Sequence, residues 1–111
     1  MSSTYEVKIT KQALEQMEEI VSYISEELCA PDAARNLLMI LEERISELSS
    51  MPKRAALIEE EPWKSQGIRK IIVNNFLVYF WIDEIHEKVQ VIAVIYHKMD
   101  QAEQLNKLRL M

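Results

Sequence analysis

The segment from Gly67 to Asp100 constrains the fold more than any other part of this chain. It contains three runs of β-branched and aromatic residues, which are Ile68–Val73, Phe76–Ile82 and Val89–Tyr96. Asn74-Asn75 separates the first two runs, and asparagine tolerates the positive φ that tight hairpin turns require. A longer polar connector separates the second run from the third. We therefore predict a three-stranded antiparallel meander.

The middle run of this meander is almost continuously apolar, so both faces of that strand should be buried against other parts of the chain. The N-terminal half can supply these contacts. Tyr5–Thr10 alternates apolar and polar residues as a half-buried strand does, and Thr10 is placed to cap a helix that begins at Lys11. An apolar stripe follows at spacings of three and four, formed by Leu14, Met17, Val21, Ile24 and Leu28.

A second helix is predicted after Cys29-Ala30-Pro31, with Asp32 as its cap. Its stripe consists of Ala34, Leu37, Leu38, Leu41, Ile45 and Leu48. The short connection implies an antiparallel helical hairpin that packs on the meander. Residues 53–66 show no period and indicate an ordered loop anchored by Trp63. The only glycine, Gly67, marks a backbone position that needs special dihedral angles.

These patterns predict one α+β domain over residues 1–111. An N-terminal strand and an antiparallel helical hairpin pack on an antiparallel sheet of about four strands. A short C-terminal helix follows, because Ala102, Leu105 and Leu108 recur at helical spacing.

The charge is unevenly distributed along the chain. The net charge is −5, with −6 on residues 1–50 and +1 on residues 51–111, so an anion-binding surface is expected on the C-terminal half. The acidic balance argues against strong nonspecific binding of nucleic acid. One cysteine excludes an internal disulfide and fits a reducing compartment. No run approaches a membrane span or a signal sequence, so we expect a cytoplasmic protein that does not contact the membrane.

Four basic or titratable residues lie at the ends of the predicted strands: Arg69, Lys70, His97 and Lys98. His97 could act as a general acid or base, since its ordinary pKa lies near neutrality. Each of these residues also has a purely structural alternative. Arg69 and Lys70 lie on opposite faces of their strand, and each can pair with a nearby acidic residue. His86 fits a turn residue, and the aromatic rings of Tyr79 and Trp81 fit sheet packing.

The order of strand, helical hairpin, loop, meander and tail resembles the RelE/ParE superfamily, over roughly Tyr5 to Leu105. The most specific matches are Pro31-Asp32-Ala33-Ala34, Gly67-Ile68-Arg69-Lys70, Phe76-Leu77-Val78-Tyr79 and the ending VIYHKMD. The resemblance implies the toxin of a bacterial type II toxin–antitoxin module. Such a toxin is held inactive by a cognate antitoxin, and it forms oligomers through toxin–antitoxin assembly.

The superfamily has two branches, and neither requires a cofactor or a metal ion. RelE-like members cleave ribosome-bound mRNA with clustered cations, and the matching catalytic positions here are Arg69, Lys70, His97 and Lys98. ParE-like members inhibit gyrase without evident active-site chemistry. This chain departs from the RelE pattern at three positions, where Phe76 and Met99 replace arginine and Leu105 replaces tyrosine.

Strand geometry also separates the candidate cations. In an antiparallel meander the last strand ends near Asn74-Asn75, about four residues at roughly 3.3 Å each from the level of Arg69. These departures favour a ParE-like noncatalytic inhibitor of gyrase or another protein. A RelE-like endonuclease and a toxin fold that has lost its activity remain the alternatives.

Overall fold

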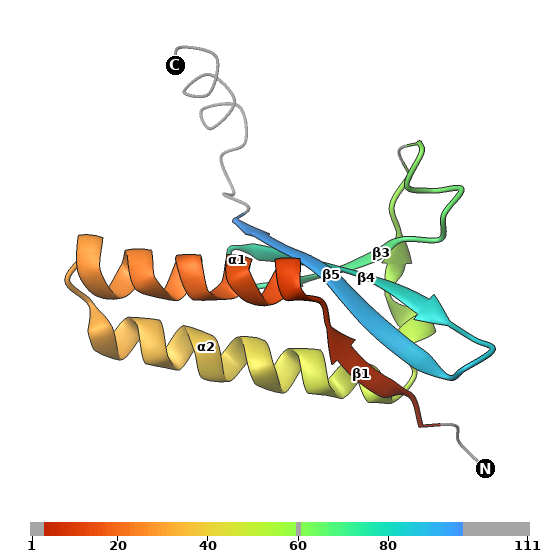
Figure 1. The fold of residues 1–111 in the computed structure, drawn as a ribbon, viewed down its shortest axis with the longest axis horizontal. Helices are drawn as coiled ribbons and strands as arrows, with labels where there is room; N and C mark the ends of the chain where they lie inside the picture. The colour runs from red at the N-terminus through yellow and green to blue at the C-terminus, as the bar shows by residue number, and fades with distance from the viewer. Residues whose placement is uncertain (1–3, 60, 97–111) are drawn as a thin grey trace.

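The computed structural model describes residues 4–59 and 61–96, which form a helical layer and a sheet layer (Figure 1). The helices are α1 (Lys11–Ser22), which continues into a π-helical turn (Tyr23–Glu27), and α2 (Pro31–Ser46), with 3₁₀ turns at Glu47–Ser49 and Pro52–Arg54. The strands are β1 (Glu6–Ile9), β2 (Ala56–Leu57), β3 (Arg69–Val73), β4 (Phe76–Asp83) and β5 (Lys88–Tyr96). The predicted α+β class and the helical hairpin are confirmed. The predicted C-terminal helix lies outside the described residues.

The sheet has the strand order β1-β5-β4-β3-β2. The predicted meander is confirmed, with β3, β4 and β5 antiparallel in turn. Two details differ from the prediction. β1 pairs parallel to β5, and the chain between these two strands is long enough for the crossover that parallel pairing requires. β2 adds a fifth strand, whose two residues are too few to show a period in the sequence.

The first helix begins as predicted, but only part of its predicted apolar stripe is buried. The Thr10 hydroxyl accepts a hydrogen bond from the Ala13 N–H at 3.2 Å. The buried residues are Ala13 and Met17, whereas Leu14 is 46% exposed and Leu28 is 55% exposed, so their predicted place in the core was wrong. Met17 belongs to the predicted stripe, whereas Ala13 takes the buried position one turn before it in place of Leu14, and spacing alone does not choose between these two neighbours. The π-helical turn then shifts the phase before Leu28.

The second helix begins two residues earlier than predicted. Ala30 is its N-cap and Pro31 is the first helical residue, a position that suits the fixed φ of proline. Asp32, predicted as the cap, lies in the first turn and forms an ion pair with Arg35. The predicted apolar stripe of this helix is confirmed, with Leu38 half-buried and the other five residues buried.

The core lies between the helices and one face of the sheet. Alternate residues of β4 face the helices, where they join buried residues from α1, α2 and β5 in one cluster; the β4 members are Phe76, Val78, Phe80 and Ile82. Asn74 has a φ of +54° in the two-residue β3–β4 turn, and Gly67 has a φ of +75° before β3. Both positive φ values were expected from the sequence.

A β-bulge in β5 is held by a side chain from α1. Tyr79 pairs with Ala93 and Phe80 pairs with Val91, so Ile92 is an extra residue. The paired residues of β1 reach only to Val91, and beyond that point α1 lies beside the edge of β5. There the Gln16 side-chain oxygen accepts a hydrogen bond from the Val94 N–H at 2.8 Å.

We expect Gln16→Ala to lower the free energy of unfolding by about 1–3 kcal/mol, because the Val94 N–H loses its partner in a partly buried place. Urea denaturation followed by circular dichroism measures this change. Gln12→Ala is the matched control, since Gln12 is exposed one turn earlier on the same helix. Equal losses in the two variants would show that the bond to Val94 contributes no stability of its own.

Candidate functional site

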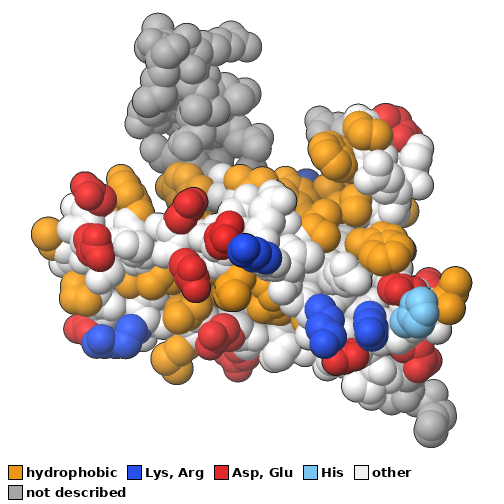
Figure 2. All heavy atoms as spheres, in the orientation of Figure 1, with side chains coloured by type: hydrophobic (Ala, Val, Ile, Leu, Met, Phe, Trp, Pro, Cys, Tyr) orange, Lys and Arg blue, Asp and Glu red, His pale blue; other side chains and the backbone are white. Residues whose placement is uncertain are grey.

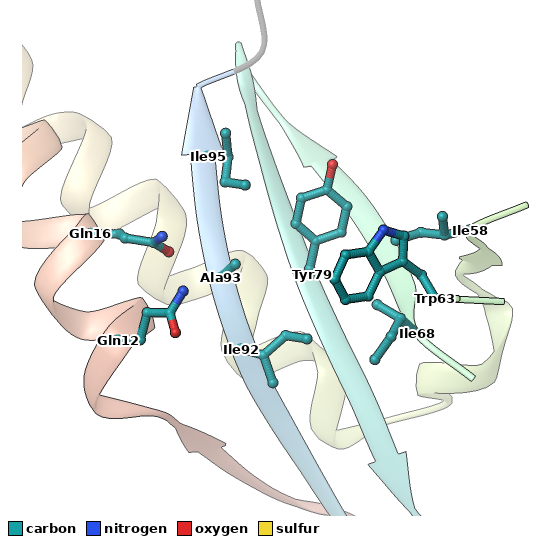
Figure 3. A pocket seen from close by; sticks show the side chains of 9 residues that line it. All are labelled: Gln12, Gln16, Ile58, Trp63, Ile68, Tyr79, Ile92, Ala93 and Ile95. Carbon is teal, nitrogen blue, oxygen red and sulfur yellow. The ribbon is translucent and has the colours of Figure 1, made fainter. Parts of the chain in front are cut away.

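The face of the sheet turned away from the core carries a groove, called here the open-face groove (Figure 3). Its floor comes from β4 and β5, one wall comes from α1, and the other comes from the loop before β3. Its volume is about 460 Å³, and it is lined by Gln12, Gln16, Ile58, Trp63, Ile68, Tyr79, Ile92, Ala93 and Ile95. These residues supply two amides and one phenol but no charge, so the groove suits an apolar ligand.

The loop wall of the groove is fixed by backbone hydrogen bonds. The Ile58 N–H donates to the Ile68 oxygen at 2.9 Å, and the Ile68 N–H donates to the Trp63 oxygen at 3.1 Å. These bonds hold the Trp63 ring beside the groove with 47% of the residue's surface exposed. The sequence predicted Trp63 as a packing anchor of the loop, whereas in the structure the residue is exposed and lines the open groove.

The two adjacent cations at the start of β3 lie on opposite faces of the sheet, as strand alternation predicts. Lys70 pairs with Tyr79 and therefore lies on the face of the groove. Arg69 pairs with Phe80 and lies on the other face. Its Nη1 donates hydrogen bonds to the backbone oxygens of Lys53 at 3.2 Å and Ala55 at 2.6 Å.

The other two predicted site residues, His97 and Lys98, lie outside the described residues. The last described residue of β5, Tyr96, pairs with Phe76 beside the β3–β4 turn. Lys70 lies at the level of Ala93, three residues earlier, which is a separation of about 10 Å along the strand. The register thus places the end of β5 away from Lys70.

Asp83, the last residue of β4, has the only carboxyl group among the described residues whose pKa is clearly lowered. The His86 ring nitrogen Nδ1 lies 2.8 Å from Asp83 Oδ2, and the His86 N–H donates to Asp83 Oδ1 at 3.2 Å. The side-chain hydrogen bond from His86 is the main cause that holds the pKa of Asp83 below its ordinary value. His86 therefore acts as a turn residue, as the sequence indicated.

This hydrogen bond predicts a pH-dependent difference in stability. Because folding lowers the pKa of Asp83, its carboxylate stabilises the fold above the unfolded-state value of about 3.9, and the effect is lost as the pH falls through the lower folded-state pKa. We expect His86→Ala to be less stable than the natural chain near neutral pH, with the difference shrinking on acidification. Urea titrations from pH 7 to below pH 3 measure it. The Asp83→Asn background is the control, where His86→Ala should show no such shrinkage.

A family comparison places this geometry in context. Residues 7–101 match the model of the ParE toxin of the type II toxin–antitoxin system parDE. The chain belongs to the ParE toxin family. No curated protein gives a significant match to this ParE-family chain.

Solved structures share the fold of this ParE-family chain. The chromosomal ParDE system from P. aeruginosa matches with a TM-score of 0.71 and 18% identity, covering 87% of this chain and 100% of the other. The RelBE2 toxin–antitoxin complex from Mycobacterium tuberculosis matches with 0.61 and 20% identity, covering 85% and 92%. The archaeal RelE–RelB complex from Pyrococcus horikoshii matches with 0.52 and 12% identity, covering 86% and 98%.

Phe76, one of the departures from the RelE pattern, has a packing role in this ParE-family chain. It is 6% exposed on the core face, and its ring centroid lies 5.3 Å from that of Tyr96. An arginine at this position would carry its charge into the core. The departures Met99 and Leu105 lie outside the described residues.

Sequence reasoning missed most of the groove. Gln12 and Gln16 lie four residues apart on α1 and so share a helix face, which was the available signal. Among the described residues, no three His, Cys, Asp or Glu side chains are placed to hold a metal ion. Within the same part of the chain, neither helix has the length and hydropathy needed to cross a membrane.

Proposed function

We propose that this ParE-family toxin acts without catalysis, by binding DNA gyrase or another protein in the cytoplasm, and that a cognate antitoxin blocks it. The family match supports the toxin role, and the solved ParDE and RelBE systems support a partner protein that assembles with the toxin. The position of Arg69 is the observation that carries the noncatalytic part of the proposal.

RNA cleavage without a metal requires a base, an acid and cations that converge on one phosphate. Arg69 is turned away from the groove, and its guanidinium is engaged by two backbone oxygens. The groove itself is lined by uncharged side chains. An uncharged surface of this kind favours contact with a protein over binding of a phosphate group.

One observation favours the RelE-like alternative. Lys70 lies on the groove face, and β5, whose Ile95 lines the groove, leads directly into His97 and Lys98 in the sequence. If these residues approach Lys70, the groove gains a cationic rim. Lys98 is therefore the residue whose substitution separates the two mechanisms.

The decisive experiment exposes purified chain, in separate reactions, to gyrase with relaxed plasmid and to ribosomes carrying mRNA. We expect inhibition of supercoiling, restored by addition of the antitoxin, and intact mRNA. Lys98→Ala should keep the fold of the natural chain. The control Lys64→Ala, which changes an exposed loop residue, should keep it as well. If the natural chain and Lys64→Ala cleave the mRNA but Lys98→Ala does not, the protein is an endonuclease instead. Activity in neither reaction would indicate a toxin fold that has lost its function, or a different protein target if expression still stops growth.

A further inference from the structure

The β4–β5 turn, residues 84–87, carries the most exposed large hydrophobic residue in the described part of the chain. Ile85 is 88% exposed, and the next such residue, Met39, is 66% exposed. Figure 1 shows this turn at the right-hand end of the long axis, at the opposite end from the connection between α1 and α2. No described segment covers the Ile85 side chain, so it is available to another molecule.

Turn formation does not explain an isoleucine at this position. Turns favour glycine, asparagine, aspartate, serine and proline, whereas β-branched residues fit strands. The neighbouring residues meet the needs of this turn, because the Asp83 side chain accepts a hydrogen bond from the His86 N–H and Glu87 adopts the positive φ of +53°. A polar residue in place of Ile85 would form the same turn and leave less apolar surface in water. Contact with another molecule explains the isoleucine better.

Bonds on both sides of Ile85 hold the turn in place. On one side, Lys53 Nζ lies 2.9 Å from Glu84 Oε1 and ties the turn to the segment before β2. On the other side, the Glu6 N–H donates to the Glu87 backbone oxygen at 2.9 Å and ties the turn to β1. A contact residue held in this way loses little conformational freedom on binding, and this favours affinity.

The charge beside Ile85 is acidic. The turn holds two glutamates and no lysine or arginine, and both glutamates are exposed. Figure 2 shows acidic side chains, a histidine and a hydrophobic side chain gathered at this end of the molecule. Glu84 pairs with Lys53, whereas no ion pair in the described part of the chain involves Glu87. Carboxylates repel phosphate groups, so this surface favours a protein with basic side chains over nucleic acid or anionic lipid.

We propose that Ile85 is the main contact between this toxin and its target protein. The complementary site on the target is an apolar pocket that accepts one branched aliphatic side chain, with a basic residue at its rim for the Glu87 carboxylate. The inference rests on the proposed function in one respect, which is that the target is a protein. It places the contact on the β4–β5 turn, outside the open-face groove.

Purified gyrase with relaxed plasmid tests this contact in the full chain. Ile85→Ser should raise the toxin concentration needed for half-maximal inhibition of supercoiling by about 10- to 100-fold, because burial of the isoleucine side chain no longer contributes to binding. Met39→Ser, which removes an exposed apolar side chain from α2, is the control and should leave that concentration unchanged. Inhibition by Ile85→Ser at the concentration of the natural chain would overturn the proposal.

Growth arrest separates failure of this inference from failure of the proposed gyrase target. If the natural chain stops growth without inhibiting gyrase, gyrase is the wrong target, and arrest at matched expression levels then tests the contact. Ile85→Ser should lose the arrest, and Met39→Ser should keep it. Arrest by Ile85→Ser, or a natural chain that neither inhibits gyrase nor stops growth, would overturn the proposal.

Two further measurements separate the target contact from a role in the fold or in antitoxin binding. Urea denaturation of Ile85→Ser should match that of the natural chain, because the side chain lies outside the core. Its affinity for the cognate antitoxin, measured by titration calorimetry, should also be unchanged. An Ile85→Ser chain that unfolds, or that no longer binds the antitoxin, would overturn the proposal.

Charge reversal tests the pairing of Glu87 with a basic residue of the target. Glu87→Lys should weaken the activity of the natural chain by about three- to tenfold in the same assays, because an attraction becomes a repulsion. Glu18→Lys is the matched control, since it makes the same change of charge at an exposed position on α1. Equal effects of the two variants, or no effect of Glu87→Lys, would overturn this pairing.

Discussion

Phe80→Ala is expected to lower the free energy of unfolding by about 3–5 kcal/mol, the largest loss foreseen for a single change in this chain. Phe80 is fully buried, and it lies in the middle of the sheet between Arg69 on β3 and Val91 on β5. It is also the largest of the fully buried side chains among the described residues. Its removal leaves a cavity where the helices and the sheet meet.

Trp81→Ala is the matched control for this prediction. Trp81 is the next residue along β4, it faces the opposite side of the sheet, and it is 37% exposed. Its loss should cost about 1–2 kcal/mol, since only part of its apolar surface is removed from water. Urea denaturation of both variants gives the comparison. Equal costs would contradict the assignment of the core to the helix-covered face.

Arg69→Met is expected to cost about 2–3 kcal/mol, because the chain loses charge-assisted hydrogen bonds to two backbone oxygens. These oxygens belong to Lys53 and Ala55, in the segment that leads into β2. Arg69 therefore ties the edge of the sheet to the loop after α2. The methionine side chain keeps most of the packing of the arginine stem but cannot donate.

Lys70→Met provides the neighbouring comparison. No ion pair to Lys70 is found among the described residues, and its replacement should change stability by no more than about 0.5 kcal/mol. Thermal and urea unfolding of both variants, with growth inhibition measured alongside, separates two roles for Arg69. If Arg69→Met folds as stably as the natural chain yet loses toxicity, Arg69 acts on the target and the structural role argued here is wrong.

The meander could be predicted because its signals are local. β-branched runs, a two-residue Asn-Asn turn and a single glycine define β3, β4 and β5 to within one residue at each end. The parallel pairing of β1 could not be predicted, because it joins segments at opposite ends of the sequence. The buried stripe of α1 was predicted only in part: Met17 is buried as expected, but the buried residue one turn before it is Ala13 and not Leu14, a choice that depends on packing.

The site could be predicted only in part. The opposite facing of Arg69 and Lys70 follows from strand alternation, but the partners of Arg69 are backbone oxygens from a distant segment, which side-chain patterns do not reveal. The groove was missed because its walls come from α1 and from a loop without a period. The catalytic assignment of Arg69, Lys70, His97 and Lys98 stays a prediction.

The parallel contact between β1 and β5 has a consequence for synthesis of the protein. Glu6 pairs with Lys88, so the first strand to leave the ribosome finds its neighbour only when most of the chain has been made. Contacts between residues so far apart in sequence slow folding, because the intervening chain must first be ordered. β1 can therefore complete the sheet only after β5 has been synthesised, although it lies nearest the beginning of the chain.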